Sequence, residues 1–448
     1  MGIKDFFKKA EPIGPGFHAG TLEIEGRTHR IHLRIEGGGN GLLTLDASRI
    51  LHLNATAAEM VLHLIRGRTE SETVGIMAKR YRVARPVLEE DIARVFATVT
   101  TLSETDQVCP MTDLGVDLIE PYSPDLSAPL RMDLAVTYRC QNKCAHCYNE
   151  PERKVEELDT ESWKRCLDRC YEAGIPHVVF TGGEPTLRED LPDLVAYAEE
   201  LGLVTGLNSN GRKLADAAAV ERLKEVGLDH VQITLESAEA AIHDEMTGAE
   251  SFDETLAGLR NAIAAGLYTL TNTTLTRKNG SGVEKLVDLA ADEGLPAVAM
   301  NGMIYSGKGK ACGEDLSPEA VIPLMEAAAR RAREREIRLI WYTPTRYCEM
   351  NPVELGLGVK QCTAARLSMA VEPDGTVIPC QSYYEGVGNL LKDDWKDIWN
   401  HSLCLRLRKP QKPLDACAAC EHLSLCGGGC PLAAESDRTC CREVSSGG

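Results

Sequence analysis

Three cysteines, Cys140, Cys144 and Cys147, lie in one short segment of the sequence. Their spacing is Cys-x3-Cys-x2-Cys, which is short enough for a single loop to gather three thiolates on one inorganic centre. Three protein ligands on a four-iron centre leave one iron open, and an open metal position can accept a bidentate ligand. A structural zinc site is the alternative for such a triplet. The pattern therefore indicates a metal centre that either performs chemistry or stabilises the fold.

A second group of cysteines lies near the end of the chain. It consists of Cys348, Cys362, Cys380, Cys417, Cys420, Cys426, Cys430, Cys440 and Cys441. Regular periodicity fades beyond Tyr347 and apolar residues become few, so we expect this segment to need metal in order to fold. Cys417-x2-Cys420 alone would also suit a zinc knuckle. Clustered thiols in a long chain ligate metal more often than they form disulfides, and we expect the remaining cysteines to be structural thiols.

The residues between these two groups alternate between short β-branched runs and helical stretches, which predicts βα units around a parallel sheet. The expected strands are 130–138, 177–181, 204–208, 230–235, 268–275 and 297–300. The expected helices are 159–173, 189–200, 214–226, 253–265 and 281–293. Six strands predict a partial, TIM-like (β/α)6 barrel. The cysteine triplet directly follows the first strand, at the end of the barrel where active sites lie.

The first hundred residues show a different pattern. Residues 17–53 alternate apolar and polar positions, which predicts hairpin strands, and helical periodicity follows over 55–66, 71–81 and 86–102. The expected fold class is therefore α/β, with a winged-helix-like domain before the barrel and a cysteine-rich iron-sulfur domain after it. The expected boundaries are 1–105 for the first domain, 106–129 for a proline-rich linker, 130–310 for the barrel, 311–345 for a bridging helical segment and 346–448 for the last domain.

Charge and hydropathy exclude some classes of partner. The formal charge of the chain is -18, so the phosphate backbone of a nucleic acid would be repelled over most of the surface. The first residues carry charges where a signal peptide needs an apolar core, and no apolar run approaches the ~20 residues of a membrane-spanning helix. We expect a cytoplasmic protein that binds neither nucleic acid nor membrane.

The segment CQNKCAHCY, from Cys140 to Tyr148, resembles the signature of radical S-adenosylmethionine (SAM) enzymes. The resemblance implies that Cys140, Cys144 and Cys147 are catalytic and hold a [4Fe-4S] cluster, with SAM bound at the open iron. Reductive cleavage of SAM would give a 5′-deoxyadenosyl radical that abstracts a hydrogen from the substrate.

Three further stretches at expected strand ends resemble SAM-binding segments of that family. Residues 182–185 are similar to its GGEP motif, in which backbone groups and the Glu carboxylate hold the SAM amino group. Residues 208–211 resemble its TNG turn, and residues 234–248 resemble its SLDG…HD…G segment, although Glu and Ser replace the usual Asp and Gly. The resemblance assigns SAM contacts to Gly182, Gly183, Glu184, Pro185, Asn208, Ser209, Glu236 and Ser237.

The second cysteine group is similar to the seven-cysteine motif of the SPASM extension, which holds two auxiliary [4Fe-4S] clusters. By that resemblance the nearer cluster would take Cys348, Cys362, Cys380 and Cys430. The farther cluster would take Cys417, Cys420, Cys426 and either Cys440 or Cys441. The upstream ligand of this family varies in position, so an open iron at Cys348 stays an alternative.

The N-terminal pattern of a hairpin followed by three helices looks like the winged-helix module that recognises leader peptides, such as the peptide chaperone of pyrroloquinoline quinone biosynthesis. Residues 51–57, LHLNATA, fit the strand-to-helix phrase of that module. In that family the peptide adds a strand to an exposed sheet edge. A purely structural cap is the alternative.

Together these resemblances imply a maturase that modifies a ribosomally made peptide by hydrogen abstraction, with cross-link formation as one outcome. The expected partners are a peptide or protein substrate and a reductant such as flavodoxin or ferredoxin. The alternatives are an enzyme that modifies a folded protein or a cofactor precursor, and a non-catalytic iron-sulfur electron carrier. No carboxylate is singled out by spacing as the acid or base.

Overall fold

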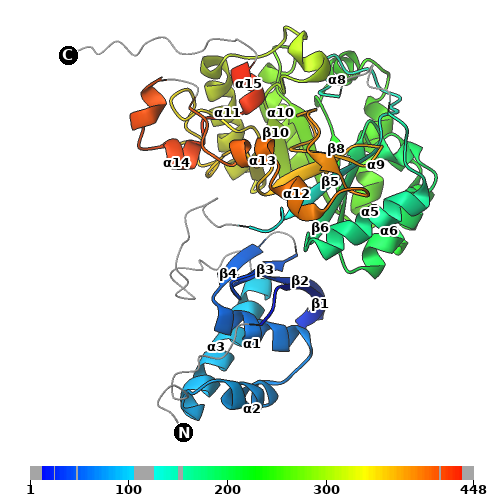
Figure 1. Cartoon of the computed structure of the whole chain (residues 1–448). Coiled ribbons are helices and arrows are strands. Elements are labelled where there is room, and N and C mark those ends of the chain that lie inside the picture. The colour runs from blue at the N-terminus through cyan, green and yellow to red at the C-terminus, as the bar shows by residue number, and fades with distance from the viewer. Residues whose placement is uncertain are drawn as a thin grey trace. The chain divides into compact units, whose positions relative to one another are not determined.

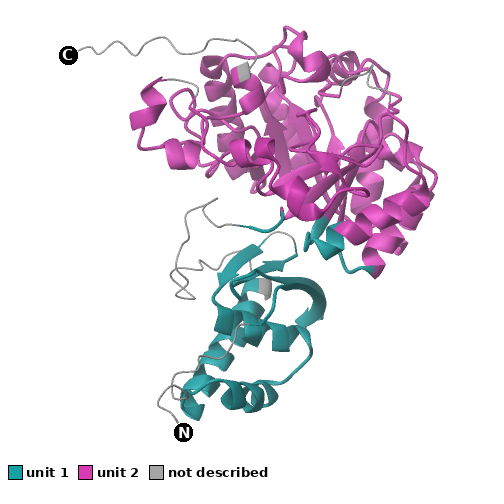
Figure 2. Cartoon of the chain, viewed as in Figure 1, with its two compact units in different colours: residues 1–128, 170–177, 201–204 teal, residues 129–169, 178–200, 205–448 magenta. Residues whose placement is uncertain are grey.

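The computed structural model describes residues 13–24, 26–46, 49–104, 126–149, 155–412 and 415–435. The chain divides into two compact units (Figure 2). The first unit consists of residues 1–128, 170–177 and 201–204, and the second of residues 129–169, 178–200 and 205–448. Cys109, Cys440, Cys441 and most of the expected linker 106–129 lie outside the described residues.

The first unit contains a four-stranded antiparallel sheet followed by three helices (Figure 1). The strands are β1 (Gly16–Ile24), β2 (Arg27–Ile35), β3 (Gly41–Leu45) and β4 (Arg49–Leu53), and they pair in chain order. The helices are α1 (Ala55–Ile65), α2 (Glu70–Arg80) and α3 (Arg85–Glu104). The Asn54 side chain caps α1 by accepting the Ala57 N–H at 2.9 Å, which explains where this helix begins. The predicted order of hairpin strands and helices is confirmed.

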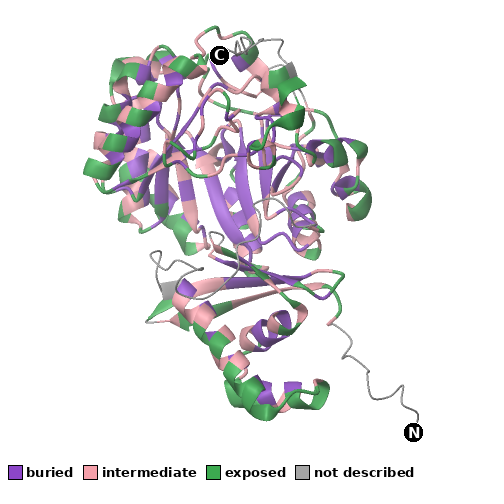
Figure 3. Ribbon diagram, turned by 90° about the vertical axis from the view of Figure 1, so that its left-hand side faces the viewer, coloured by how far each residue is buried: buried purple, intermediate pink, exposed green. Residues whose placement is uncertain are grey.

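The six barrel strands predicted from the sequence are all present in a larger sheet. They are β5 (Arg131–Thr137), β6 (His177–Gly182), β7 (Val204–Ser209), β8 (His230–Thr234), β9 (Tyr268–Thr274) and β10 (Ala297–Asn301). They lie side by side in chain order. Their buried apolar side chains form the core, and Figure 3 shows buried residues concentrated in these strands and exposed ones on the outer sides of the helices.

The sheet extends past these six strands on both sides. Strand β11 (Arg338–Trp341) pairs in parallel with β10, inside the expected bridging helical segment 311–345. On the other side β12 (Ser368–Val371) pairs in parallel with β5, and the antiparallel strands β13 (Thr376–Ile378) and β14 (Gly388–Asn389) follow. The cysteine-rich segment therefore contributes strands to the barrel sheet.

Most helices of the second unit connect successive strands, and those from α12 onward follow the last strand, β14. The longer ones are α5 (Thr160–Glu172), α6 (Leu191–Glu200), α7 (Ala217–Glu225), α8 (Ala240–Thr247), α9 (Phe252–Ala264), α10 (Val283–Asp292) and α11 (Pro318–Glu334). Short ones are η2 (Pro185–Leu187), η3 (Lys213–Ala215), η4 (Gly280–Gly282), η5 (Gly307–Lys310), α12 (Trp395–Trp399), α13 (Ser402–Leu407), η6 (Asp415–Ala419), α14 (Leu423–Cys426) and α15 (Pro431–Glu435). None of the helices in the described ranges is long and apolar enough to cross a membrane.

Candidate functional site

The cysteine triplet lies in a loop, residues 138–149, that directly follows β5 and contains no helix or strand. We call it the cysteine loop. The end of α8 fixes its backbone, because the Lys143 N–H donates to the Thr247 carbonyl at 2.8 Å. Gly248 follows with φ 65°, and a Cβ there would lie 2.8 Å from the Lys143 carbonyl oxygen. Glycine is therefore needed for this close approach.

Helix η5, which follows β10, supports the other end of the cysteine loop. The Gly309 N–H donates to the Cys147 carbonyl at 3.3 Å. A Cβ on Gly307 would overlap the carbonyl oxygen of Asn149. The sequence interpretation missed this segment, although the signal was available: Gly307-x-Gly309 follows the sixth barrel strand at the same edge as the other motifs.

The three loop thiols lie near carboxylates; Cys140 is exposed, and Cys144 and Cys147 are half-buried. Burial raises the pKa of Cys140, Cys144 and Cys147, and the carboxylate of Glu184 or Glu236 raises each further. The charge of one thiolate also raises the pKa of another, which places the three close together. Thiolates in such surroundings need cationic metal to be stable, so the donor set fits an iron-sulfur cluster. Among the described residues, no three Cys, His, Asp or Glu side chains converge as ligands of a single ion do.

The glycine turn after β6 packs directly on the cysteine loop. The Gly183 N–H donates to the Thr137 carbonyl and the Glu184 N–H to the Arg139 carbonyl, both at 2.8 Å. A Cβ on Gly182, which has φ 125°, would overlap the Thr137 carbonyl oxygen, and one on Gly183 would lie 2.6 Å from the Tyr138 carbonyl oxygen. Both glycines are thus required, independently of any ligand, where the end of β6 meets the end of β5 and the start of the cysteine loop. Pro185 is buried and begins η2.

The Glu184 carboxylate connects the glycine turn to the turn after β7. Its Oε2 accepts the Asn210 N–H at 2.7 Å, and its Oε1 accepts the Ser209 hydroxyl at 2.9 Å and the Thr186 N–H at 3.1 Å. The side chain is fully buried, and burial raises its pKa while these hydrogen bonds oppose the increase. The carboxylate that the resemblance assigns to the SAM amino group is therefore bonded to protein groups that position the two turns.

The turn after β7 also contacts the cysteine loop. The Asn210 amide donates to the Cys140 sulfur at 3.9 Å, and the Arg212 guanidinium donates to the Asn142 side-chain oxygen at 2.9 Å. Asn208 lies half-buried in β7, whereas Ser209 is buried and bonded to Glu184. Of the residues in this turn, Asn210 is the one next to a predicted iron ligand.

Glu236, at the end of β8, forms an ion pair with His146 of the cysteine loop. The His146 Nε2–Glu236 Oε1 distance is 2.9 Å, and Oε2 accepts the Thr274 N–H at 2.9 Å. Burial alone would lower the pKa of His146, but the Glu236 carboxylate outweighs burial and raises it. The pair fixes the position of the residue between Cys144 and Cys147.

The remaining parts of the 234–248 segment serve local structure. The Ser237 hydroxyl accepts the Glu239 N–H at 3.0 Å, before α8 begins. His243 Nδ1 accepts the Glu236 N–H at 3.2 Å, and burial lowers the pKa of His243, so its ring is neutral. The Asp244 carboxylate accepts the Ser251 N–H at 2.8 Å. These bonds hold Glu236 toward His146 and shape the turn at Gly248.

Three of the predicted auxiliary ligands lie close together. Burial raises the pKa of Cys362 and raises that of Cys380 to about 12. The negative charge of the Cys430 thiolate raises the pKa of both thiols further. Cys348 is exposed, and Cys426 is buried against the chain just before it, where its sulfur accepts the Tyr347 N–H at 3.5 Å. Cys417 is half-buried and Cys420 is exposed. All cysteines within the described ranges are free thiols.

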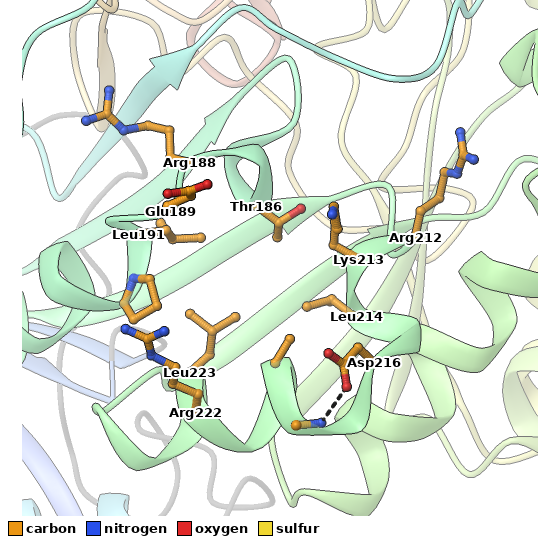
Figure 4. A pocket seen from close by; sticks show the side chains of 13 residues that line it. Thr186, Arg188, Glu189, Leu191, Arg212, Lys213, Leu214, Asp216, Arg222 and Leu223 are labelled. Atoms are coloured by element: carbon orange, nitrogen blue, oxygen red, sulfur yellow. Dashed lines mark hydrogen bonds between the residues drawn. The ribbon is translucent and has the colours of Figure 1, made fainter.

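A cavity of about 540 Å³ lies beside the two turns, between α6 and α7 (Figure 4). Its charged wall residues are Arg188, Glu189, Arg212, Lys213, Asp216 and Arg222. Arg188 is paired with Asp190 at 2.6 Å, and Asp216 caps α7. No cysteine lines this cavity, so we do not assign it to the metal centre.

Two family models match the chain. The model described as "Radical SAM superfamily" matches residues 134–290, and the one described as "Iron-sulfur cluster-binding domain" (SPASM) matches residues 362–421. Fe-coproporphyrin III synthase of Methanosarcina barkeri is 30% identical over 334 residues, which is 67% of this chain and 83% of that protein. PqqA peptide cyclase of Streptomyces rochei is 32% identical over 319 residues, which is 68% of this chain and 85% of that protein.

The structure of Streptococcus suis SuiB bound to its precursor peptide SuiA is similar over nearly the whole chain. The TM-score is 0.68 at 16% sequence identity, and the match covers 94% of this chain and 97% of SuiB. At this identity the likeness concerns the fold alone, and it includes more of the chain than the two sequence relatives do.

Proposed function

Because the chain belongs to the radical SAM superfamily and carries a SPASM iron-sulfur domain, we propose that it is a maturase that modifies a ribosomally made peptide by hydrogen abstraction. The observation that carries the peptide part is the first unit, a small sheet with an open edge fused to the barrel. It has the fold expected of a leader-peptide module, and the likeness to SuiB covers 94% of the chain.

The site residues fit the cofactors of this family. Reductive cleavage of SAM at the [4Fe-4S] cluster supplies a 5′-deoxyadenosyl radical when both are bound. Cys140, Cys144 and Cys147 would hold the cluster, and the His146–Glu236 pair keeps the loop between them in place. Glu184 keeps the turns after β6 and β7 in register, so that their backbone groups can orient SAM.

The C-terminal cysteines would hold two auxiliary clusters. The proximity of Cys362, Cys380 and Cys430 supports a shared cluster with Cys348 as the fourth ligand. Cys417, Cys420 and Cys426 would hold the second cluster with Cys440 or Cys441. We propose that these clusters take up the electron that remains after hydrogen abstraction. A flavodoxin or ferredoxin would supply the reducing electron in the cytoplasm, where thiols stay reduced.

The peptide would dock on β4 of the first unit. Within the described part of this sheet, β4 pairs with β3 alone and leaves its other edge open. Ile50 is 44% exposed there and His52 is exposed, whereas Leu51 between them is buried. An added strand gains main-chain hydrogen bonds at such an edge and contacts alternate side chains.

The test is anaerobic incubation of the full chain with SAM, a reductant and short peptides encoded beside its gene, followed by mass spectrometry. We expect one peptide to change mass, and Ile50→Asp to weaken its binding while SAM cleavage without peptide is retained. Leu405→Asp, at an equally exposed apolar residue of α13, is the matched control. SAM cleavage with no peptide bound or modified would contradict the proposal.

A second candidate is the modification of a cofactor precursor. The observation that favours it is the 30% identity to Fe-coproporphyrin III synthase, whose name indicates a tetrapyrrole product. The same incubation with iron-containing tetrapyrroles in place of peptides distinguishes the two. Conversion of a tetrapyrrole and of no peptide would support this second candidate.

A further inference from the structure

Two residues at the end of the cysteine loop bond to the segment that follows Cys380. The Tyr148 hydroxyl donates to the Gln381 side-chain oxygen at 3.1 Å. The Tyr384 hydroxyl donates to the Asn149 side-chain oxygen at 2.9 Å. Tyr148 and Asn149 directly follow Cys147, and Gln381 directly follows Cys380. Two predicted cluster sites that are more than 200 residues apart in sequence are thus joined by short side-chain links.

The same asparagine also bonds to the glycine turn. Its amide nitrogen donates to the Gly182 carbonyl at 2.7 Å. A carbonyl can only accept, so the amide NH2 must face Gly182, and the amide oxygen then faces the Tyr384 hydroxyl. The Gly182 carbonyl therefore sets which way the amide faces, and the Tyr384 hydroxyl adds a hydrogen bond that holds the amide oxygen in that place. Removing the phenolic hydroxyl leaves the amide oxygen without this donor.

The ring of Tyr384 has its own support from the first residue of the cysteine loop, Tyr138. It packs edge-on against Tyr138, with ring centroids 6.5 Å apart, and the Tyr138 hydroxyl donates to the Glu372 carboxylate at 3.0 Å. The backbone before Tyr384 turns at Cys380, where the Tyr383 N–H donates to the Cys380 carbonyl at 3.0 Å. The place of the Tyr384 hydroxyl therefore depends on the conformation of residues 380–384.

We propose that Tyr384 is a positioning residue that couples the metal site at Cys380 to SAM binding through Asn149 and the Gly182 carbonyl. Residues 380–384 would be fixed when Cys380 ligates metal, and the hydroxyl of Tyr384 would then hold the amide oxygen of Asn149, whose NH2 group donates to the Gly182 carbonyl of the glycine turn. Coupling between two sites is reciprocal, so SAM binding must also affect the metal site at Cys380. The proposal concerns SAM binding alone and does not depend on the nature of the substrate.

The test measures SAM affinity and cluster spectra in the anaerobically reconstituted full chain. Tyr384→Phe keeps the ring packing and removes one hydrogen bond, worth about 1 kcal/mol, so we expect the Kd for SAM to rise about fivefold with unchanged iron content. In the wild type, SAM should change the electron paramagnetic resonance spectrum of the C-terminal clusters, and in Tyr384→Phe this change should be smaller. Tyr383→Phe is the matched control, because the Tyr383 hydroxyl bonds to Arg406 and not to Asn149.

Two further variants separate coupling from a general loss of structure. Cys380→Ser should weaken SAM binding by a similar factor, and adding Tyr384→Phe to it should cause little further loss, since both act on one path. In a protein that already carries Asn149→Ala, adding Tyr384→Phe should cause almost no further change in the Kd for SAM. Wild-type SAM affinity in Tyr384→Phe, an equal effect of Tyr383→Phe, or full additivity with Cys380→Ser would overturn the proposal.

Discussion

Replacing Glu184 with glutamine tests whether one buried carboxylate positions the two turns that we propose bind SAM. Donors approach both of its oxygens: Asn210 N–H approaches Oε2, and the Ser209 hydroxyl and Thr186 N–H approach Oε1. A glutamine side chain has one oxygen and one NH2 group, so in either orientation its NH2 faces one of these donors. The variant therefore loses at least one charge-assisted hydrogen bond and leaves a buried group unsatisfied.

The expected loss of SAM affinity follows from the loss of at least one charge-assisted hydrogen bond. A hydrogen bond to a charged group contributes about 1.5–3 kcal/mol, and every 1.4 kcal/mol corresponds to a tenfold change in affinity. If the turns must be in register to bind SAM, the Kd for SAM in Glu184→Gln should rise about 10- to 100-fold, measured by anaerobic equilibrium dialysis. Glu189→Gln is the control, because this nearby carboxylate is exposed and the described residues give it no hydrogen bond or ion pair. Wild-type affinity in Glu184→Gln at equal iron content would refute the reasoning.

Three further predictions concern glycine packing, the structural thiols and pH. Gly183→Ala places a Cβ 2.6 Å from the Tyr138 carbonyl oxygen, so it should lower the folding stability by about 1–3 kcal/mol and lower the iron content. The Cβ of Gly75→Ala meets no atom within 4 Å, so this control should change neither quantity. Cys166→Ala removes a fully buried thiol of α5, so we expect a lower melting temperature with unchanged iron; loss of iron would contradict a structural role. Burial lowers the pKa of His230 to about 4, so the folded protein favours the neutral ring. The contribution of this ring to folding stability is therefore present above about pH 6.5 and is lost as the pH falls toward 4. The melting temperature of the wild type should therefore fall more steeply over this range than that of His230→Gln, and parallel curves would contradict this.

Sequence patterns predicted the parts of the site that depend on local order. Successive parallel strands place their carboxyl ends at one edge of a sheet, so motifs that follow strands must lie near each other. This is why the sequence alone places the cysteine loop, the turn at Gly183 and the turn at Ser209 together. Helical periodicity is also a pattern of residues near one another in sequence, so the helices could be predicted. The caps at Asn54 and Thr69 agree with the predicted starts of α1 and α2 within one or two residues.

Long-range pairing could not be predicted in the same way. Strand β12 pairs with β5 although more than 200 residues separate them, and four residues such as 368–371 carry no signal of their partner. The His146–Glu236 ion pair and the Tyr384–Asn149 bond have the same origin, since each joins segments that only the folded sheet brings together. The sequence shows the motif that contains Glu184, but it does not show that this side chain bonds to the neighbouring turn.

The central claim is that the cysteine loop holds the cluster that cleaves SAM, and one measurement tests it directly. The protein with Cys140, Cys144 and Cys147 all replaced by alanine is reconstituted anaerobically, reduced with dithionite and incubated with SAM, and 5′-deoxyadenosine is quantified beside the iron content. We predict no 5′-deoxyadenosine above background, with iron retained by the C-terminal cysteines. Formation of 5′-deoxyadenosine at the wild-type rate by this variant would contradict the account.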